Sequence, residues 1–413
     1  MRRFFLAVSV LALVGCGFSG TDGQEQSGQG TAAAGQQSDN LADTLRSADY
    51  GAASSDIPNI PDSEERPVMQ AQVMLDRVGF GPGVIDGKMG MSTTNALKGF
   101  QEANGIAVTG ELDEPTKQLL AKGQQFTATR LVRIPEDWGQ QQYAPLPEDP
   151  AEKAKLERLG YGSLDERLAE RFHTTVDVLK SLNPNGQPAG MTAAAGATPA
   201  SATATATPSP TPAITPSGRG TASPTPTTSA TPAVFKPGQL IRVPNIGGDR
   251  IQPGTVKDEN WQRTLVELGV GSQQPKVARV VVSKGEKTLK AYNAENKLVA
   301  LFTVSSGSAE NPLPLGDWDI LGVSYNPTYT YDPEVLDSVA DDSGQKHQFP
   351  PGPNGPVGVV WIDLSKEHYG IHGTPEPQTI GRAQSDGCVR LTNWDAARLA
   401  QMVDTSTKVE FTA

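Results

Sequence analysis

The chain has 413 residues, 33 prolines, 43 glycines and a formal net charge of -11. This length suits two or three modest domains joined by linkers better than one large core. Binding to nucleic acid would need clustered Lys and Arg, and the sequence has no basic stripe, so we exclude nucleic acid as a partner.

The N-terminus has the features of an export signal. Arg2 and Arg3 precede an apolar run from Phe4 to Val14, which is too short to span a membrane and has the length of a signal-peptide core. The run ends in Leu-Val-Gly-Cys, which resembles a bacterial lipobox. That resemblance implies a lipoprotein signal peptide over residues 1–15 and a lipid on Cys16. The alternative is an ordinary secretory signal with an incidental cysteine.

A lipid on Cys16 implies a place in the cell envelope. We expect the chain on the periplasmic side, at the outer membrane if the organism is Gram-negative, with a lipid anchor as its membrane contact. Residues 16–65 are rich in Gly, Ser, Gln and Ala and nearly free of aromatic residues. Such a segment cannot bury enough apolar surface to offset its ordering entropy, so we expect a disordered tether.

Residues 66–122 combine apolar residues at helical spacing with an Asp86-Gly87 turn and, later, the run Thr-Asn-Ala-Leu-Lys-Gly-Phe-Gln. This segment resembles the small three-helix peptidoglycan-binding domain. Turn chemistry and a helical core account for most of the same residues without any ligand. The sequence therefore predicts the module but not the side chains that contact glycan.

Two short amphipathic helices are predicted next, from apolar residues three or four apart: Leu164, Leu168 and Phe172, then Val176, Leu179 and Leu182. They resemble the first part of a LysM module, whose usual Pro-Gly-Gln and closing strand follow only at 237–244. We expect one LysM-like module over 155–246, with a Pro/Thr/Ala-rich insertion at 186–233. Loop closure costs only about 0.6 kcal/mol per doubling of length, so such an insertion is tolerable. The alternative is a linker between two unrelated pieces.

The pattern becomes strand-like from residue 277. Val280 to Val282, the alternation around Leu289 and the run from Leu298 to Val304 predict strands, with a turn at 293–296. Near the end, Thr392 begins a Thr-Asn-Trp-Asp sequence that is typical of a helix N-terminus. Cys388 is therefore expected in a short strand or turn just before a helix.

His372 lies sixteen residues before Cys388, the only cysteine left once Cys16 carries a lipid. A free thiol has a pKa of about 8.5, so only about 3% is thiolate at neutral pH, and an imidazole that takes the proton raises the reactive fraction. A segment that returns through Pro375, Pro377 and Gly381 can bring the two side chains together. The alternative is a buried histidine and an inert core cysteine.

The residues around this pair resemble the active-site motif of the L,D-transpeptidase (YkuD-type) catalytic domain. The matching positions are His372, Gly373, Thr374, Gly381, Ser385, Gly387, Cys388, Arg390 and Asn393. The resemblance implies a β-rich domain over 277–413, with Cys388 as nucleophile, His372 as base and the carbonyl of Gly373 holding the other ring nitrogen. Asp386 departs from the family, many of whose members have histidine there. Its carboxylate would raise the cysteine pKa unless it is solvated or paired.

Roles for the remaining site residues follow from their chemistry. The N–H groups of Gly387 and Cys388 are candidate oxyanion donors. Ser385 either orients the loop or contacts substrate. Arg390 either binds a substrate carboxylate or pairs with Asp395 or Asp386.

The expected substrate-binding set also includes Thr374, Asp386, Tyr329 and Tyr331. The two tyrosines lie in the stretch from Pro312 to Gln348, which is long and poor in apolar residues. We interpret this stretch as a lid over the cleft.

These observations predict a multidomain fold: a small all-α peptidoglycan-binding domain, a LysM-like α/β module with a low-complexity insertion, and a β-rich catalytic domain, a sandwich or barrel with short helices. The expected partners are peptidoglycan stem peptides and glycan, with a protein amine as a further possible acceptor. We expect binding and chemistry on separate modules, so that removing a wall-binding module leaves turnover of a small stem peptide nearly intact.

The resemblance implies cysteine acyl transfer from a stem tetrapeptide to an amine, which forms 3-3 cross-links or attaches an amine-bearing partner. Two alternatives remain open: a peptidoglycan carboxypeptidase or endopeptidase that uses water, and a non-catalytic wall-binding lipoprotein. A metal site at His368, His372 and Cys388 is disfavoured because Gly370 interrupts a helix and no zinc motif accompanies them. We predict no cofactor and no metal.

Overall fold

The computed structural model describes residues 57–122, 126–191, 233–246, 251, 254–333, 345–383, 385 and 387–413. The predicted signal peptide, Cys16, most of the tether and insertion, and Asp386 lie outside these ranges. All described residues belong to one compact body formed by residues 43–413, and its three parts are described in turn. Within the described part of the chain, no helix is both long and apolar enough to cross a bilayer.

The three helices predicted for residues 66–122 are present as α2 (Pro67–Arg77), α3 (Met91–Ala103) and α4 (Glu114–Lys122). The predicted turn is present as well, because Gly87 has a φ of 74° and its N–H donates to buried Gln72 Oε1 at 2.8 Å. Gln72 also donates to the Asp86 carboxylate at 3.0 Å. These bonds account for Asp86 and Gly87 as turn residues.

These helices share their core with the C-terminal domain. Leu75, Leu97 and Phe100 lie in one buried cluster with Leu298 and Leu301. The two-residue strand β1 (Phe80–Gly81) pairs in parallel with β6 (Leu298–Thr303). The first module therefore adds a strand to the catalytic sheet.

The second unit consists of β2 (Thr129–Arg133), α6 (Leu164–Arg171), α7 (Val176–Leu182) and β3 (Leu240–Pro244), with the short helix α5 (Pro150–Lys153) in the connection after β2. Both predicted amphipathic helices are present, capped by the side chains of Ser163 and Thr175. Strand β2 pairs antiparallel with β3. The predicted start at residue 155 leaves out β2, because a long polar connection separates this strand from the helices.

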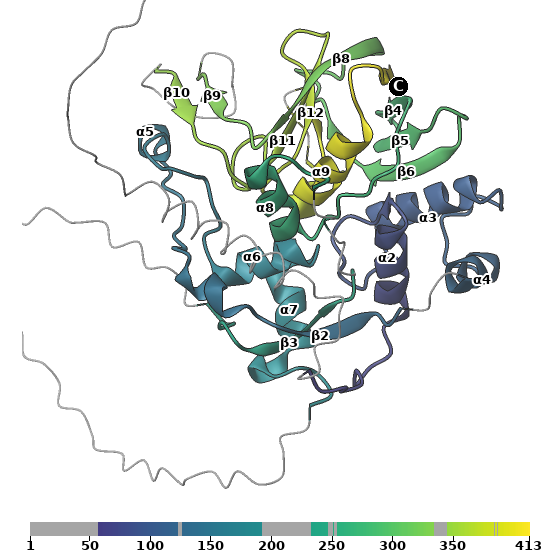
Figure 1. Ribbon diagram of the computed structural model, residues 1–413. Coiled ribbons are helices and arrows are strands. Elements are labelled where there is room, and N and C mark those ends of the chain that lie inside the picture. The colour runs from purple at the N-terminus through teal and green to yellow at the C-terminus, as the bar shows by residue number, and fades with distance from the viewer. Residues whose placement is uncertain are drawn as a thin grey trace, which may run out of the picture. The chain divides into compact units, whose positions relative to one another are not determined.

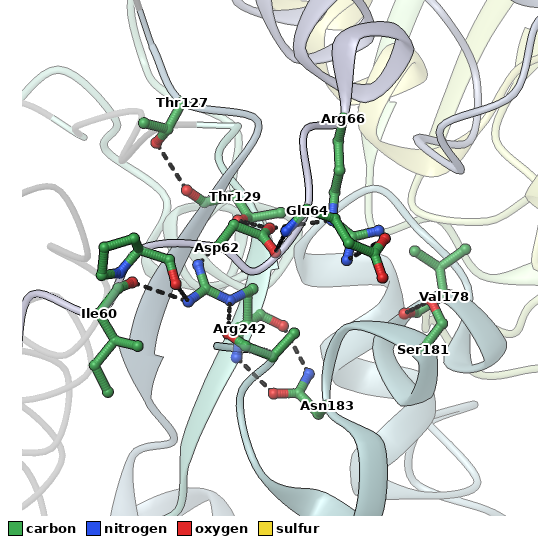
Figure 2. A network of polar contacts seen from close by, with 12 residues as sticks. Ile60, Asp62, Glu64, Arg66, Thr127, Thr129, Val178, Ser181, Asn183 and Arg242 are labelled. Carbon is green, nitrogen blue, oxygen red and sulfur yellow. Dashed lines mark hydrogen bonds and ion pairs between the residues drawn. The ribbon is translucent and has the colours of Figure 1, made fainter. Parts of the chain in front are cut away.

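The two halves of this unit pack together from opposite sides of the insertion. Asn183 Nδ2 donates to the Arg242 carbonyl at 2.7 Å, and the Arg242 N–H donates to Asn183 Oδ1 at 2.7 Å. Figure 2 shows the buried Arg242 guanidinium, which donates to the carbonyls of Ile60 and Pro61 at 2.9 and 3.0 Å. The last residues of the predicted tether are therefore held against this unit.

The C-terminal domain is β-rich, as predicted, and Figure 1 shows its strands around helix α9 (Asn393–Met402). Helix α8 (Glu259–Leu268) precedes the sheet. The strands are β4 (Arg279–Ser283), β5 (Thr288–Tyr292), β6, β7 (Ser305–Ser306), β8 (Gly316–Tyr325), β11 (Val360–Leu364), β12 (Gly370–His372), β13 (Val389–Arg390) and β14 (Lys408–Thr412). With β1 they form one ten-stranded sheet in the order β1-β6-β5-β4-β14-β8-β11-β12-β13-β7.

The lid interpretation of 312–348 is wrong for its first part. Strand β8 lies inside the sheet between β14 and β11. Five of its ten residues are apolar, but much of its length is exposed, and the neighbouring segments are rich in Pro, Gly and Asp, so the whole stretch resembled a loop. Beyond it, β9 (Tyr329–Tyr331) pairs with β10 (His347–Phe349), and residues 334–344 lie outside the described ranges.

Helix α9 carries buried contacts to both other units. Its Arg398 donates to both carboxylate oxygens of Asp76 on α2, at 2.8 and 2.9 Å. His173, which follows α6, contacts the same carboxylate at 3.1 Å and stacks on Trp394 with the ring centroids 4.8 Å apart. Burial alone would raise the pKa of Asp76, but the Arg398 and His173 charges outweigh it and hold this pKa well below its usual range. The expectation of independent modules is wrong, because these charges are buried only while all three parts are packed together.

Replacing Arg398 with Leu should therefore destabilise the full chain by about 3–5 kcal/mol, because it removes the guanidinium that pairs with both oxygens of the buried Asp76 carboxylate and leaves only the single contact with His173. The double variant Asp76→Leu/Arg398→Leu should lose less unfolding free energy than Arg398→Leu, because it removes the buried carboxylate as well. Lys408→Leu is the control, since its pair with Asp319 is exposed, with the lysine side chain 71% accessible, and should cost at most about 1 kcal/mol. Urea unfolding measures all three, and equal losses for the two single variants would contradict the prediction.

Candidate active site

Strand pairing brings His372 and Cys388 to neighbouring positions. Strand β12, which ends at His372, pairs in parallel with β13, so that Ile371 lies opposite Val389 and His372 opposite Arg390. Cys388 directly precedes β13, so it lies at the start of the strand that pairs with the end of β12. The segment 373–387 leaves the sheet after the histidine and returns to it at the cysteine, as the sequence predicted.

His372 is 5% exposed, and its Nδ1 lies 2.7 Å from the carbonyl oxygen of Gly373, as the family resemblance implied. A carbonyl only accepts, so Nδ1 carries the hydrogen and Nε2 is the unprotonated nitrogen of the neutral ring. Burial lowers the pKa of His372 to about 4; the Gly373 bond opposes this shift and the Arg390 charge adds to it. The imidazole is therefore neutral at neutral pH and can accept a proton at Nε2.

Trp361 is a neighbour of His372 that the sequence analysis missed. It lies directly opposite His372 in the pairing of β11 with β12, and the two rings stack with centroids 5.6 Å apart. Only the pairing register reveals this contact, because eleven residues separate the two in the chain.

The thiol of Cys388 is half-buried, with Sγ 3.7 Å from the His368 carbonyl oxygen. The Ser385 hydroxyl donates to the Cys388 carbonyl at 2.5 Å and accepts from the Gly307 N–H at 2.7 Å. Both bonds of this buried serine go to the backbone. They favour the loop-orienting role over substrate contact.

Glycine is required at two positions of the site. Gly387 has a φ of 103°, and a Cβ there would lie 2.6 Å from Cε1 of Tyr369. A Cβ on Gly373 would collide with Oδ1 of Asn393. The backbone on both sides of the segment 373–387 is therefore packed too closely for any larger residue.

Asn393, the first residue of α9, links the Gly373 backbone to the second unit. Its Nδ2 donates to Glu170 Oε1 on α6 at 2.8 Å and to the Pro353 carbonyl at 3.0 Å, while its Oδ1 accepts from the Val359 N–H at 3.3 Å. Burial raises the pKa of Glu170 to about 7. Sequence analysis gave Glu170 no role, because it lies opposite the apolar face of its helix.

The structure separates the other predicted residues. Thr374 is buried and accepts from the Glu376 N–H at 3.2 Å. Asp395, one of the two acids expected to pair with Arg390, lies 3.7 Å from Arg398 instead. The other expected partner, Asp386, lies outside the described residues.

The tyrosines lie on β9, outside the ten-stranded sheet. Tyr331 is buried against Phe349 and Leu159, so its ring face is covered, whereas Tyr329 keeps a partly exposed side chain. Tyr329 is thus the better placed of the two for a substrate. Over the ranges that the structure describes, no three His, Cys, Asp or Glu side chains gather as a metal site.

Comparisons with known proteins show which families the β-rich domain and the first helical module resemble. Residues 277–411 match the L,D-transpeptidase catalytic domain, and residues 64–120 match a putative peptidoglycan binding domain. A putative L,D-transpeptidase of Fuscovulum blasticum is 30% identical over 130 residues, which cover 32% of this chain and 67% of the relative. The chain belongs to the L,D-transpeptidase family.

Other similarities cover different shares of the relatives. A putative L,D-transpeptidase of Bacillus licheniformis is 28% identical over 41% of this chain and 81% of its own length. One from Bacillus subtilis is 32% identical over 32% of this chain, and the match spans 63% of that relative. L,D-transpeptidase 3 from Mycobacterium tuberculosis has 17% identity and a TM-score of 0.28, over 35% of this chain and 63% of the other. The family assignment rests on the sequence matches, because a TM-score this low does not establish a shared fold.

Burial of neutral His372 makes stability depend on pH. The pKa of His372 is about 4 in the folded chain against 6.5 for a free histidine side chain, so the unfolded chain takes up the proton first as pH falls. The contribution of neutral His372 to the free energy of unfolding is therefore fully present above pH 6.5. It falls by about 3 kcal/mol as pH falls from 6.5 to 4. The difference in unfolding free energy between the parent and His372→Gln should shrink by that amount over this range. A difference that does not change with pH would contradict the neutral buried imidazole.

Loss of the Glu170 carboxyl should disturb the position of the His372 imidazole, although Glu170 does not contact His372 directly. In a Cys16→Ser chain, where Cys388 is the only thiol, Glu170→Ala should slow alkylation by iodoacetamide at pH 7 by about tenfold, because Asn393 no longer fixes Gly373 and His372. Glu170→Gln keeps an acceptor for Asn393 and should stay within about twofold of the parent. Glu157→Ala, an exposed position, is the control. Equal rates for Glu170→Ala and Glu170→Gln would show that the contact does not position the base.

Proposed function

We propose that the protein is a cell-wall L,D-transpeptidase in which Cys388 is the nucleophile and His372 the base. The observation that supports this most is the His372 ring, buried and neutral, with Nδ1 held by the Gly373 carbonyl and its strand adjacent to the thiol. A backbone carbonyl takes the orienting role that a carboxylate has in many triads. Family membership supplies the reaction class, and the peptidoglycan-binding match supports peptidoglycan as the substrate.

The chemistry is ping-pong acyl transfer. Cys388 Sγ attacks the carbonyl at the L-centre of the third residue of a stem tetrapeptide while His372 Nε2 accepts the thiol proton. N–H groups of Gly387 and Cys388 stabilise the oxyanion. Collapse breaks the bond to D-alanine, whose amine takes the proton from the imidazolium, and leaves a thioester. An acceptor amine then attacks the thioester, gives up its proton to His372 and restores the thiol.

The acceptor decides the product. A second stem gives a 3-3 cross-link, and a free D-amino acid or a protein lysine gives an attached amine. Water would make the same acyl-enzyme a carboxypeptidase or endopeptidase. Cross-linked dimers in a muropeptide digest indicate transfer, and trimmed stems indicate hydrolysis.

The second unit is proposed as a LysM-like glycan-binding module. Its order of strand, two helices and strand supports this, as does the packing of Leu168, Phe172 and Leu179 with Ile241 and Val243 from beyond the insertion. Both wall-binding modules would raise the effective concentration of the enzyme on its polymeric substrate. Deleting either one should also reduce turnover of a small soluble peptide, because the buried contacts of α9 need both.

Cys388→Ala should abolish release of D-alanine from a soluble stem tetrapeptide. His372→Ala should lower release by about 10²–10⁴-fold, the usual contribution of a general base. His368→Asn is the matched control: this side chain is 79% exposed and has a φ of 67°, which asparagine tolerates, so release should be unchanged. Undiminished release by Cys388→Ala would mean that another group is the nucleophile.

We also propose that the chain is anchored in the cell envelope by a lipid on Cys16, as its Leu-Val-Gly-Cys sequence suggests. Cys16→Ala should move the protein from the membrane fraction to the soluble fraction, because the remaining apolar run is too short to span a bilayer. Immunoblotting of the two fractions measures this. Unchanged fractionation would refute lipid anchoring.

A further inference from the structure

A cavity of about 560 Å³ opens between three segments that are far apart in the sequence. One wall comes from residues 82–93 of the peptidoglycan-binding module, another from residues 175–181 around the start of α7, and the third from residues 377–382. The third wall belongs to the segment 373–387, which joins His372 to Cys388. The volume lies within the range of ligand pockets in proteins.

The wall next to the active site is held in place. Lys287 Nζ donates to the Gly381 carbonyl at 2.9 Å, and the Gly381 N–H donates to Ser305 Oγ at 2.8 Å. A Cβ on Gly381 would collide with the methyl group of Met91. The peptidoglycan-binding module therefore directly contacts the segment that positions the catalytic pair, and the cavity is built from both.

Charge distinguishes the possible occupants of this cavity. Lys88 and Arg382 are exposed on different walls of the cavity. Neither side chain forms a hydrogen bond or an ion pair with another described residue. The Asp86 carboxylate already accepts from Gln72 and from the Lys88 N–H at 3.0 and 2.9 Å. Asp177 on α7 is exposed and can pair with an ammonium group.

The apolar part of the lining includes two exposed methionine side chains. Met89 and Met91 are 47% and 37% exposed, although large apolar side chains are usually covered. Methionines adapt to irregular aliphatic groups. Two available cations, one acid and two thioethers suit a short peptide that carries carboxylates, an amine and methyl groups, because cations recognise carboxylates directly.

We propose that this cavity binds a second stem peptide of peptidoglycan, beside the one that reacts at Cys388, with its carboxylates on Lys88 and Arg382. The proposal rests on the proposed function for the identity of the peptide. Because one wall of the cavity consists of residues 377–382, which lie between His372 and Cys388 in the chain, we assign the bound stem the role of acceptor.

The test measures binding of a fluorescent stem tetrapeptide to the full chain carrying Cys388→Ala, by anisotropy. Lys88→Glu and Arg382→Glu should each weaken binding by about tenfold or more, because each removes a charged contact and adds repulsion. Lys88→Arg and Arg382→Lys should stay within about threefold. Lys180→Glu, the same charge change on α7 but outside the lining, is the matched control and should bind like the parent.

An uncharged variant gives a second measurement. Ser181→Trp fills the cavity and should weaken binding, whereas Lys180→Trp should not. Equal affinity in Lys88→Glu, Arg382→Glu and Lys180→Glu would overturn the proposal. A second result would also overturn the proposal. If a wall disaccharide without peptide binds, its binding depends on Lys88 and Arg382, and the tetrapeptide does not bind, the cavity is a glycan site.

Release of D-alanine by the chain with Cys388 intact separates the two claims. If binding depends on Lys88 and Arg382 but no D-alanine is released, the transpeptidase assignment fails and the peptide site stands. If D-alanine is released but binding ignores both cations, only the peptide site fails.

Discussion

The contacts of one helix, α9, determine the arrangement of the rest of the molecule. Arg398 binds Asp76 of the peptidoglycan-binding module through two hydrogen bonds, and Trp394 stacks on His173 of the second unit. Asn393, at the start of the same helix, packs against Gly373, whose carbonyl holds His372. Burying this many charges is costly unless each is paired, so the backbone around His372 and the two preceding units are favoured in one arrangement.

This arrangement changes how wall binding and chemistry relate. Modules on free linkers would contribute only effective concentration. Here Leu301 of the ten-stranded sheet lies in the core of the first module, and Glu170 of the second accepts a hydrogen bond from Asn393, which packs against Gly373. The walls of the cavity proposed for a second stem peptide include residues of both units, so loss of either unit would alter that cavity.

Local patterns predicted what depends on neighbours in the chain. Apolar spacing identified α6 and α7, the Thr392 cap identified the start of α9, and the motif around His372 and Cys388 identified the L,D-transpeptidase domain. The sequence could not reveal the contacts of Asn393 with Glu170 or of Arg398 with Asp76, because 223 and 322 residues separate these partners and isolated charges look like solvated surface. Strand β8 was misread because the Pro-, Gly- and Asp-rich segments beside it outweighed its five apolar residues, most of which are not buried.

The central claim is that the Cys388 thiol, served by neutral His372, accepts an acyl group from a stem peptide. Intact-mass spectrometry of the Cys16→Ser chain, quenched with acid soon after mixing with stem tetrapeptide, tests it most directly. We predict a mass increase equal to the tetrapeptide minus D-alanine, mapped to the peptide that contains Cys388 and absent from Cys388→Ala. An unmodified Cys388 in a chain that nevertheless releases D-alanine, or an adduct on any other residue, would contradict the account.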